Sequence, residues 1–328
     1  MINCVESVFK TSYNNIEVLV VDNASKDQSH KKCKEKFSKI ILIENEQNLG
    51  YCEGNNVGIR EASGEFIVIL NPDTTVDHNW ITELVSAYRE HGDGLYQPKI
   101  ISLYEENILQ STGNMIHLFG FGFARDKGIV DSNKRNRIER VGYASGTCLF
   151  TSQRVLKKIG LFDPFLFLYH DDLDLGWRAS QIDIKSYYVP ASIVYHAESY
   201  NFRWSSKKFY WLERNRRYCL LTHYSKNTYK RIFPYLLQTE ILVWIFYLTK
   251  GFVGPKIRAE LDIIKNKKHI QQKYDELESK KIIPDMELIK SFPDEIFVPK
   301  NVSGGFGSYI FNSLLKKLSR KAKNRIIK

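Results

Sequence analysis

The chain has 328 residues, and its 48 Lys and Arg exceed its 37 Asp and Glu, which gives a formal net charge of +11. Hydrophobic residues make up 43% and charged residues 26%, proportions that are ordinary for globular proteins and exclude a largely disordered chain. No run of 18 residues is uniformly apolar, which excludes a protein with several membrane spans.

Strand-like and helical patterns alternate through the first part of the chain. Apolar periodicity predicts helices at 2–10, 25–37, 53–62 and 79–89, and runs of Val, Ile and Leu predict strands at 16–25, 39–45 and 65–73. Apolar strands that are each followed by a helix are typical of parallel β-α-β units. Such sheets bind ligands at the carboxyl ends of strands, which directs attention to the polar turns after residues 21 and 70.

The pattern becomes less regular between residues 95 and 200. Shorter strands are predicted around YQPKI, GTCLFT, IKSYYV and SIVYH, and residues 104–141 are predicted to be a loop. SQRVLKKIG (152–160) predicts a helix that ends at Gly160, because glycine commonly follows the last helical residue. HDDLD (170–174) opens another predicted helix, and long helices are expected beyond residue 225.

The five cysteines are scattered along the chain and form no C-x-x-C pair, so the sequence indicates neither a zinc site nor a disulfide framework. Reduced thiols are typical of a cytoplasmic protein. The first residues, MINCVESVFK, carry an acid and no apolar core, so no signal peptide is expected.

Acidic residues gather where predicted strands end and helices begin. Asp22 ends the first strand, Asp73 ends the third, and Asp171, Asp172 and Asp174 open a helix. Taken singly, each has an ordinary explanation as a turn or capping residue. Repulsion among the three helical carboxylates raises at least one pKa, whereas the helix N-terminus opposes that shift. The sequence alone leaves the balance between these two effects open.

Several motifs follow one another in a specific order. They are VDNASKDQS (21–29), NLGYCEGNNVGI (48–59), LNPDTTV (70–76), GLFDPFLFLYHDDLDLGWR (160–178), VYHAES (194–199) and ERNRRY (213–218). In this order they resemble the motifs of the family 2 glycosyltransferases, especially the rhamnosyltransferase-like branch. The resemblance implies an inverting enzyme of α/β class with the GT-A fold, a mostly parallel central sheet flanked by helices. It covers residues 1–225, which leaves 226–328 as a helical extension.

The resemblance also implies a nucleotide-sugar donor, either a UDP- or a dTDP-sugar. The donor-binding residues that it implies are Asp22, Asn48, Gly50, Asn71, Asp73 and Gly146. Asp22 would accept the imide N–H of uracil or thymine, a donor that cytosine lacks. Asp73 would ligate Mg²⁺ or Mn²⁺, which neutralises the diphosphate leaving group. His196 would be a second metal or diphosphate contact, although a lone His at a strand end is as often structural.

An inverting transfer needs one base that takes the proton from the acceptor hydroxyl as it attacks the anomeric carbon. The resemblance places this base at Asp172, and it places Asp171, Asp174 and Arg178 on the acceptor side or in supporting roles. The implied acceptor is a glycan or a lipid-linked sugar in the synthesis of a cell-surface polysaccharide.

The chain departs from the family pattern at its start. Family members begin with a strand of the type V-S-I-I-I-V-N-Y-N, whereas this sequence begins at the helix that follows. That strand is central in the sheet, so its loss would leave neighbouring backbone groups without partners. We therefore expect the natural protein to start upstream. A truncated, non-catalytic relative that binds a membrane or a partner is one alternative. The other is a nucleotidyltransferase, whose glycine-rich phosphate loop is not visible.

Positive charge gathers toward the C-terminus, where residues 250–328 hold 18 Lys and Arg against 9 Asp and Glu. YLLQTEILVWIFYLT (235–249) is short for a span of ~20 residues, so an in-plane or buried helix is expected. Residues 313–328 predict a basic amphipathic helix, with Leu314, Leu315, Leu318, Ala322 and Ile326 on one face. The expected partner is the anionic inner face of the cell membrane, and a solvated tail is the alternative. Nucleic acid is not expected, since no binding motif accompanies the charge.

Overall fold

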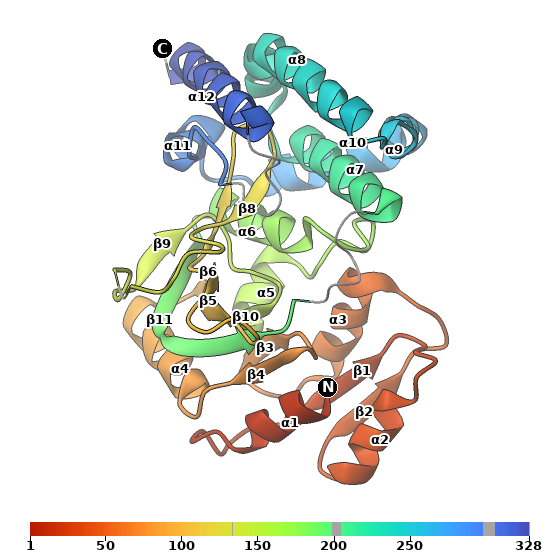
Figure 1. The fold of residues 1–328 in the computed structure, drawn as a ribbon, viewed down its shortest axis with the longest axis vertical. Coiled ribbons are helices and arrows are strands. Elements are labelled where there is room, and N and C mark those ends of the chain that lie inside the picture. Colours follow the sequence, from red (N-terminus) through yellow and green to blue (C-terminus); the bar gives the residue numbers. More distant parts are fainter. Residues whose placement is uncertain (133, 199–204, 298–305, 328) are drawn as a thin grey trace. The chain divides into compact units, whose positions relative to one another are not determined.

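The computed structural model describes residues 1–132, 134–198, 205–297 and 306–327 (Figure 1). Its contacts divide the chain into two compact units. The first comprises Met1–Asn114, Ala124–Ala179 and Ile184–Ser199, and the second comprises Met115–Phe123, Ser180–Asp183 and Tyr200–Lys328. The expected division into residues 1–225 and 226–328 stays a prediction.

The first unit holds most of the strands. The elements that belong wholly or mainly to it are α1 (Ile2–Phe9), β1 (Leu19–Asp22), α2 (Ser29–Lys36), β2 (Ile41–Glu44), α3 (Gly50–Glu61), β3 (Phe66–Leu70), β4 (Thr74–Val76), α4 (Trp80–His91), β5 (Gly94–Ser102), β6 (Leu109–Ser111), β9 (Glu139–Val141), β10 (Cys148–Ser152), α5 (Gln153–Ile159), α6 (Asp171–Gln181) and β11 (Lys185–His196). β1 and β2 pair in parallel as a separate two-stranded sheet. With α2 between them in the chain, they form the first β-α-β unit that the sequence predicted.

The central sheet has seven strands in the order β3-β10-β5-β11-β4, with β6 on β5 and β9 on β11. β10 lies between β3 and β5 and runs antiparallel to both, so β3 and β5 point in one direction. β11 is parallel to β5, whereas β4, β6 and β9 pair antiparallel. The α/β class with helices flanking a central sheet is confirmed. The expectation of a mostly parallel sheet is wrong, because β10 is inserted between strands that β-α-β connections would otherwise make neighbours.

α4 packs against β5 and β11 and forms one core of this sheet (Figure 1). Trp80, Leu84 and Tyr88 lie on one face of α4, as the sequence predicted, and belong to a buried cluster with Tyr96 of β5 and Phe150 of β10. Full burial of each large apolar side chain stabilises the fold by about 1.5–3 kcal/mol. This core holds the strands whose ends carry the predicted site residues.

Two predicted segments differ from the structure. Residues 104–141 include short strands, among them β6 and β9, rather than a continuous loop; strands of three residues are too short to show a periodic pattern. The strands predicted near 184–189 and 192–196 are one strand, β11, whose register against β5 shifts between Val189 and Ile193. Pro190 follows Val189 and has no N–H to donate to the ladder, which explains the irregularity.

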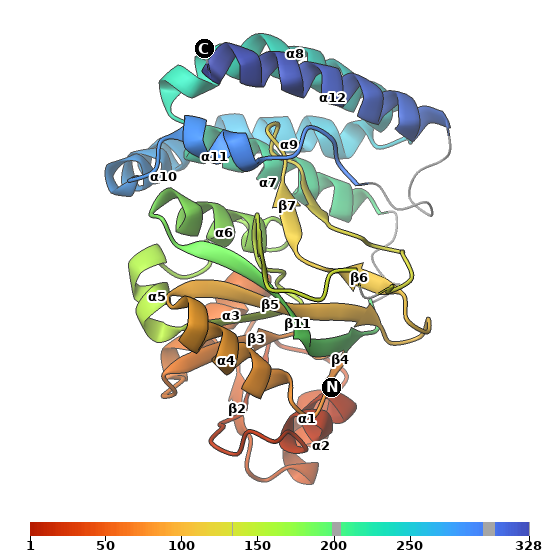
Figure 2. The same cartoon turned by 90° about the vertical axis from the view of Figure 1, so that its left-hand side faces the viewer.

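The second unit is mainly helical. Its elements are β7 (Asn114–Ile116), β8 (Gly122–Ala124), α7 (Ser206–His223), α8 (Lys226–Thr249), α9 (Val253–Lys265), α10 (Lys267–Lys280), α11 (Asp285–Ser291) and α12 (Phe306–Ile327). Figure 2 shows α8 and α12 side by side as one layer, with α7, α9, α10 and α11 beneath it. The long helices expected beyond residue 225 are therefore present.

α8 is longer than the sequence indicated, because the helix begins at Lys226 and has 24 residues. By length and composition it is the one helix in the described part of the chain that could cross a membrane. The most apolar 18-residue window of α8 has a mean hydropathy of 1.4, and 28% of that window is buried.

α12 confirms the predicted C-terminal helix, but its apolar face is covered. Leu315, Ala322 and Ile326 are buried, and α12 packs against α8. Most of the expected apolar stripe is therefore unavailable to a membrane because it is buried, whereas Leu314 stays exposed; membrane association itself stays a prediction.

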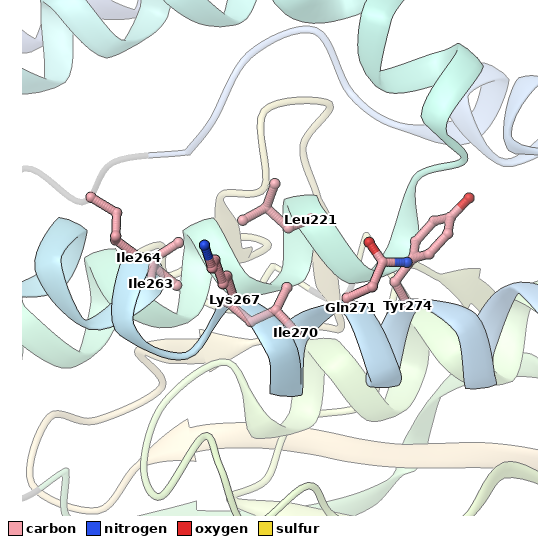
Figure 3. Close-up of a pocket in the computed structure, with 7 residues that line it drawn as sticks. All are labelled: Leu221, Ile263, Ile264, Lys267, Ile270, Gln271 and Tyr274. Atoms are coloured by element: carbon pink, nitrogen blue, oxygen red, sulfur yellow. The ribbon is translucent and has the colours of Figure 1, made fainter.

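A cavity of about 370 Å³ lies among α7, α9 and α10 (Figure 3). It is lined by Leu221, Ile263, Ile264, Lys267, Ile270, Gln271 and Tyr274. The lining is mostly apolar and contains none of the residues that the motifs singled out.

Candidate active site

The residues singled out in the sequence lie at the ends of strands in the first unit. β1 ends at Asp22 and β11 ends at His196. β10 runs antiparallel to β3, so its first residue, Cys148, pairs with the last residue of β3, Leu70. The segment before β10 therefore meets the segment after β3, and the amide of Asn71 donates to the carbonyl of Thr147 at 3.0 Å. The insertion of β10 thus brings the LNPDTTV motif (70–76) next to the segment that contains Gly146.

Asp172 lies on the first turn of α6 and is held by two backbone amides. Its Oδ2 accepts a hydrogen bond from the N–H of Gly146 at 3.0 Å, and its Oδ1 accepts one from Leu173 at 2.8 Å. Burial raises the pKa of Asp172 to about 6, although both amide hydrogen bonds act to lower it. The side chain still keeps part of its surface exposed. A carboxylate held in this way, with a pKa of about 6, could act as a general base near neutral pH.

Asp171 precedes this base and is buried. Burial, followed by the charge of Asp172, raises the pKa of Asp171 well above its usual range. The pKa rise that the sequence weighed is therefore present, but burial is its largest cause and repulsion from Asp172 comes second. The pKa values of both neighbouring carboxyl groups are therefore raised, and burial is the largest cause for each.

Gly146 is the point where α3 and α6 approach each other. Its carbonyl accepts a 2.5 Å hydrogen bond from the Tyr51 hydroxyl, while its amide binds Asp172. A Cβ at this position would lie 2.9 Å from Tyr51 Oη and 3.3 Å from Asp171 Oδ2. The close approach therefore explains the glycine, and it leaves the predicted contact with the donor sugar untested.

Asn48 and Gly50 shape the turn that starts α3. The side-chain oxygen of Asn48 accepts from the Gly50 amide at 2.9 Å, and Gly50 has a φ of +77°. A Cβ on Gly50 would lie 2.5 Å from the Phe167 ring and 2.7 Å from the Phe167 carbonyl. That carbonyl accepts from the Tyr51 amide at 2.7 Å. Together these contacts attach the loop before α6 to the N-terminus of α3.

Asp22 is buried at the end of β1. One of its oxygens accepts from the Ser25 amide at 2.9 Å, and the other lies 3.3 Å from Nδ1 of His30. Nε2 of His30 lies 3.1 Å from a carboxylate oxygen of Glu44. The next residue, Asn23, donates to the Gly50 carbonyl at 2.9 Å. Asp22 is therefore held rigidly and is linked to the turn at Gly50.

Asp73 and His196 face each other across a short gap. Nε2 of His196 lies 3.4 Å from Oδ1 of Asp73, and the carbonyl of Asp73 accepts from the Ala197 amide at 2.9 Å. Gln110 donates from Nε2 to the His196 carbonyl at 2.9 Å, which leaves its Oε1 to accept from Nδ1 of the ring at 2.6 Å. Because Nδ1 carries the proton, a neutral His196 directs the lone pair of Nε2 at a carboxylate.

This geometry fits a divalent cation. Two lone pairs that face each other repel unless a proton or a cation lies between them. A carboxylate oxygen and an oriented imidazole nitrogen are ligands that Mn²⁺ accepts, and Mg²⁺ prefers the oxygen. Asp73 and His196 could therefore hold such an ion, with Gln110 orienting the ring.

Asp174 and Arg178 have structural contacts. Both are buried on α6, and the guanidinium donates to Oδ2 of Asp174 at 2.9 Å. The same guanidinium donates to the carbonyls of Ile159 at 2.8 Å and Leu161 at 2.9 Å, at the end of α5. These contacts support α6 from behind the base, while any part in acceptor binding is untested.

The glycosyl transferase family 2 model matches residues 1–160, just under half of the chain. Residues 1–160 form a family 2 glycosyltransferase domain. A curated relative, the low-salt glycan biosynthesis hexosyltransferase Agl10 of Haloferax volcanii, is 28% identical over 189 residues, which are 55% of this chain and 59% of Agl10. The N-acetylglucosaminyl-diphospho-decaprenol L-rhamnosyltransferase of Mycobacterium tuberculosis is 26% identical over 209 residues, 57% of this chain and 68% of the relative.

Solved structures agree with the GT-A fold. GalNAc-T7, crystallised with UDP, GalNAc and Mn²⁺, superposes with a TM-score of 0.55 at 18% identity, covering 71% of this chain and 47% of GalNAc-T7. S. aureus TarS superposes with a TM-score of 0.50 at 16% identity, covering 98% of this chain and 52% of TarS. At these identities the likeness establishes the fold alone. The family 2 domain therefore has the GT-A fold that the motifs implied.

Sequence reasoning missed three side chains that organise the site. Tyr51 follows Gly50 inside a recognised motif and could have been found there. Gln110 lies in the segment predicted as a loop, 86 positions from the histidine that it orients, so no local signal marked it. His30 contacts Asp22 because α2 folds back on β1, a proximity that depends on packing.

Proposed function

We propose that the protein is an inverting glycosyltransferase that moves a sugar from a UDP- or dTDP-sugar to a glycan or lipid-linked acceptor. The observation that carries this proposal is the carboxylate of Asp172, which two backbone amides orient and whose pKa burial raises to about 6. A base with this pKa is ionised at neutral pH and remains a good proton acceptor. Asp172 would take the proton of the acceptor hydroxyl, while the raised pKa of Asp171 beside it favours the uncharged form of that neighbour.

The donor would bind along the strand ends that the family 2 domain brings together. Asp22 would accept the imide N–H of uracil or thymine, and the rigid contacts around it support this role. Gly50 and Gly146 would contact the diphosphate and the sugar through their backbone, and Asn48 and Asn71 would act as further donor contacts.

Asp73 and His196 would hold the divalent cation. When bound, the cation neutralises the charge that develops on the diphosphate leaving group. Gln110 keeps the proton of His196 on Nδ1, so Nε2 remains available as a ligand. Both site residues belong to the first unit, which supports catalysis by residues 1–225.

The acceptor and the location of the protein are part of this proposal. Curated relatives are named for glycan biosynthesis and for a diphospho-decaprenol-linked acceptor, which supports a cell-surface glycan. A lipid-linked acceptor places the enzyme on the cytoplasmic side of the cell membrane, with residues 226–328 as the membrane-associated extension. The positive charge of those residues suits an anionic lipid surface rather than a neutral one.

The test is a screen of nucleotide sugars for release of nucleoside diphosphate, with Mn²⁺ and with EDTA. We expect release from a UDP- or dTDP-sugar that EDTA abolishes and that Asp73→Ala reduces at least a hundredfold. Lys158→Ala, a surface change on α5, is the matched control. Full activity in EDTA would contradict the metal role, and no release from any donor would favour the non-catalytic alternative.

A further inference from the structure

α8 is apolar on both of its faces. The face packed inside the second unit carries the buried residues Thr228, Ile232, Leu236, Thr239, Val243 and Tyr247. Away from that face lie the exposed residues Phe233, Leu237, Ile241, Trp244, Ile245 and Leu248, which we call the α8 outer stripe; Trp244 lies at its edge, with its ring also against Lys256. Leu237, Ile241 and Ile245 are 53%, 55% and 52% exposed. A stripe of this size on a soluble surface indicates an interaction site.

Length does not decide how α8 would meet a membrane. A helix of 24 residues is about 36 Å long, enough to cross the hydrocarbon core. The decisive feature is Glu240, which lies near the middle of α8 on its inner side. Its carboxylate accepts from Arg216 on α7 at 2.5 Å and from Lys256 on α9 at 2.9 Å.

A network of buried charges surrounds Glu240. Lys256 is fully buried and also binds Glu213 of α7 and Glu260 of α9, and Arg216 binds Glu213. A membrane-spanning α8 would have to leave these partners and bring a carboxylate into hydrocarbon. Breaking a buried pair of this kind is strongly unfavourable, so the network holds α8 against α7 and α9.

Positive charge lies next to the α8 outer stripe. α12 runs alongside α8 (Figure 2), and Lys317, Lys321 and Arg325 follow one another at i, i+4 and i+8 on its exposed side. Lys316 and Arg320, in contrast, bind Glu295 and Asp294. One layer of the second unit therefore presents an apolar stripe on one helix and a cationic stripe on the next.

From this juxtaposition we infer that α8 is an in-plane anchor: its outer stripe inserts into one leaflet of an anionic bilayer, the α12 cations bind lipid phosphates, and α8 does not cross. Buried apolar area and electrostatic attraction to anionic lipid are the two terms that hold interfacial helices. A second copy on the same face would bring the cationic stripe against its own image, whereas anionic lipid neutralises it. The inference deepens the proposed membrane partner and does not depend on sugar transfer.

The first test is flotation of the intact protein with vesicles of phosphatidylglycerol and phosphatidylcholine, and with phosphatidylcholine alone. We expect binding to the anionic vesicles at low salt and at least tenfold weaker binding to the neutral ones. The stripe variant Leu237→Glu/Ile241→Glu/Ile245→Glu should reduce binding at least tenfold. Its matched control is Tyr104→Glu/Val130→Glu/Ile282→Glu, which changes three equally exposed apolar residues elsewhere.

Charge is tested in the same assay. Lys317→Glu/Lys321→Glu/Arg325→Glu should reduce binding about tenfold, whereas Lys31→Glu/Lys32→Glu/Lys39→Glu on and after α2 makes the same change in net charge and should have little effect. Nucleoside diphosphate release is measured on every variant without vesicles. A variant that no longer binds vesicles but still releases nucleoside diphosphate supports the anchor. A variant that binds vesicles normally but releases no nucleoside diphosphate would count against the proposed function alone.

The second test separates an in-plane helix from a spanning one. All five native cysteines are buried, so Lys226→Cys and Lys250→Cys place single reactive thiols at the two ends of α8. With protein bound to the outside of sealed vesicles, an impermeant maleimide should label both positions. Trp244 should be quenched more by lipids brominated near the headgroup than by deeply brominated ones, and Trp244→Phe should remove that difference.

Each remaining outcome overturns the inference. Protection of one thiol but not the other would mean that α8 crosses the bilayer. No binding at low salt, or equal binding to neutral and anionic vesicles, would exclude an anionic bilayer as the partner. If the protein binds no vesicles and light scattering shows that the stripe variants convert a dimer into a monomer, a second copy covers the stripe. The Trp244 measurement uses the unaltered chain, so a stripe variant that fails to fold leaves the inference testable.

Discussion

At the scale of single residues, the candidate site depends on opposing effects on two neighbouring carboxyl groups. Burial raises the pKa of Asp172 to about 6, and the amides of Gly146 and Leu173 limit the rise. Asp171 is also buried, and although the amides of Asp171 and Asp172 act to lower its pKa, that pKa lies well above the usual range. The causes of both shifts depend on packing, which spacing within HDDLD does not reveal.

Asp172→Asn tests the base. The amide keeps the size of the side chain but accepts no proton, so kcat should fall by roughly 10²–10⁴. In the unaltered protein kcat/KM should decline as the pH falls below about 6, because protonated Asp172 is inactive, and the variant should lose this limb. Asp171→Asn is the matched control and should be milder, since the raised pKa of Asp171 favours its protonated form. A damaging Asp171→Asn beside a mild Asp172→Asn would place the base one residue earlier.

Gln110→Leu tests the orientation of His196. Without the accepting oxygen, the proton can move to Nε2 and the ring can turn, so affinity for Mn²⁺ should fall about 10–100-fold. Titration calorimetry with Mn²⁺ in the presence of donor measures this affinity. The control is Gln153→Leu. This glutamine lies on α5 and donates to the Ala62 carbonyl, so its loss should leave the affinity for Mn²⁺ unchanged. Equal affinities in both variants would mean that His196 is not a ligand.

At the scale of elements, β10 decides where the motifs meet. Its antiparallel insertion between β3 and β5 places Gly146 beside the end of β3, and the Tyr51 hydroxyl connects that point to α3. The N-terminus of α3 in turn receives the Phe167 carbonyl. Three segments far apart in the chain are therefore held by hydrogen bonds from Tyr51 to the backbone carbonyls of Gly146 and Phe167, which makes the glycines in them sensitive positions.

Gly50→Ala tests this arrangement. The φ of +77° is unfavourable for alanine, and its Cβ would overlap the Phe167 ring and carbonyl. We expect a loss of about 1–3 kcal/mol in the free energy of unfolding, measured with urea. Gly254→Ala in α9 is the control, because a Cβ there meets nothing within 4 Å, and it should be neutral or slightly stabilising. Equal unfolding midpoints would contradict the structural account.

At the scale of the whole molecule, two kinds of packing coexist. The first unit has an apolar core around α4, whereas the second joins α7, α8 and α9 through buried charges. Burial acts to raise the pKa of Glu240, but Arg216 and Lys256 lower it to about 2. The stabilisation by this carboxylate is therefore present above its ordinary pKa near 4.5 and is lost as the pH falls toward 2.

Lys256→Met tests the network. The variant leaves Glu213 and Glu240 buried without one of their cations, so the second unit should lose about 3–5 kcal/mol of stability. Urea unfolding at pH 7, monitored by hydrogen exchange of the α8 amides, measures this loss of stability. Lys158→Met breaks an exposed pair with Asp93 and should cost less than about 1 kcal/mol. If both variants unfold alike, the buried charges do not hold α8.

Local patterns in the sequence were sufficient for most elements and for the identity of the site motifs. The faces of α4 and α12 and the end of α5 at Gly160 were predicted correctly, because side-chain spacing and backbone preference act over a few residues. The carboxylates and glycines of the motifs were also visible, since chemistry restricts which residue types can serve there. Each of these features depends on neighbours along the chain.

Only the tertiary structure decided which elements are neighbours. Periodicity shows that a face is buried but not what buries it, so the apolar face of α12 was assigned to a membrane although α8 covers it. The insertion of β10, the orientation of His196 by Gln110 and the charges around Glu240 join residues far apart in sequence. Their free energy depends on desolvation and on partners that packing supplies, and no local pattern encodes either.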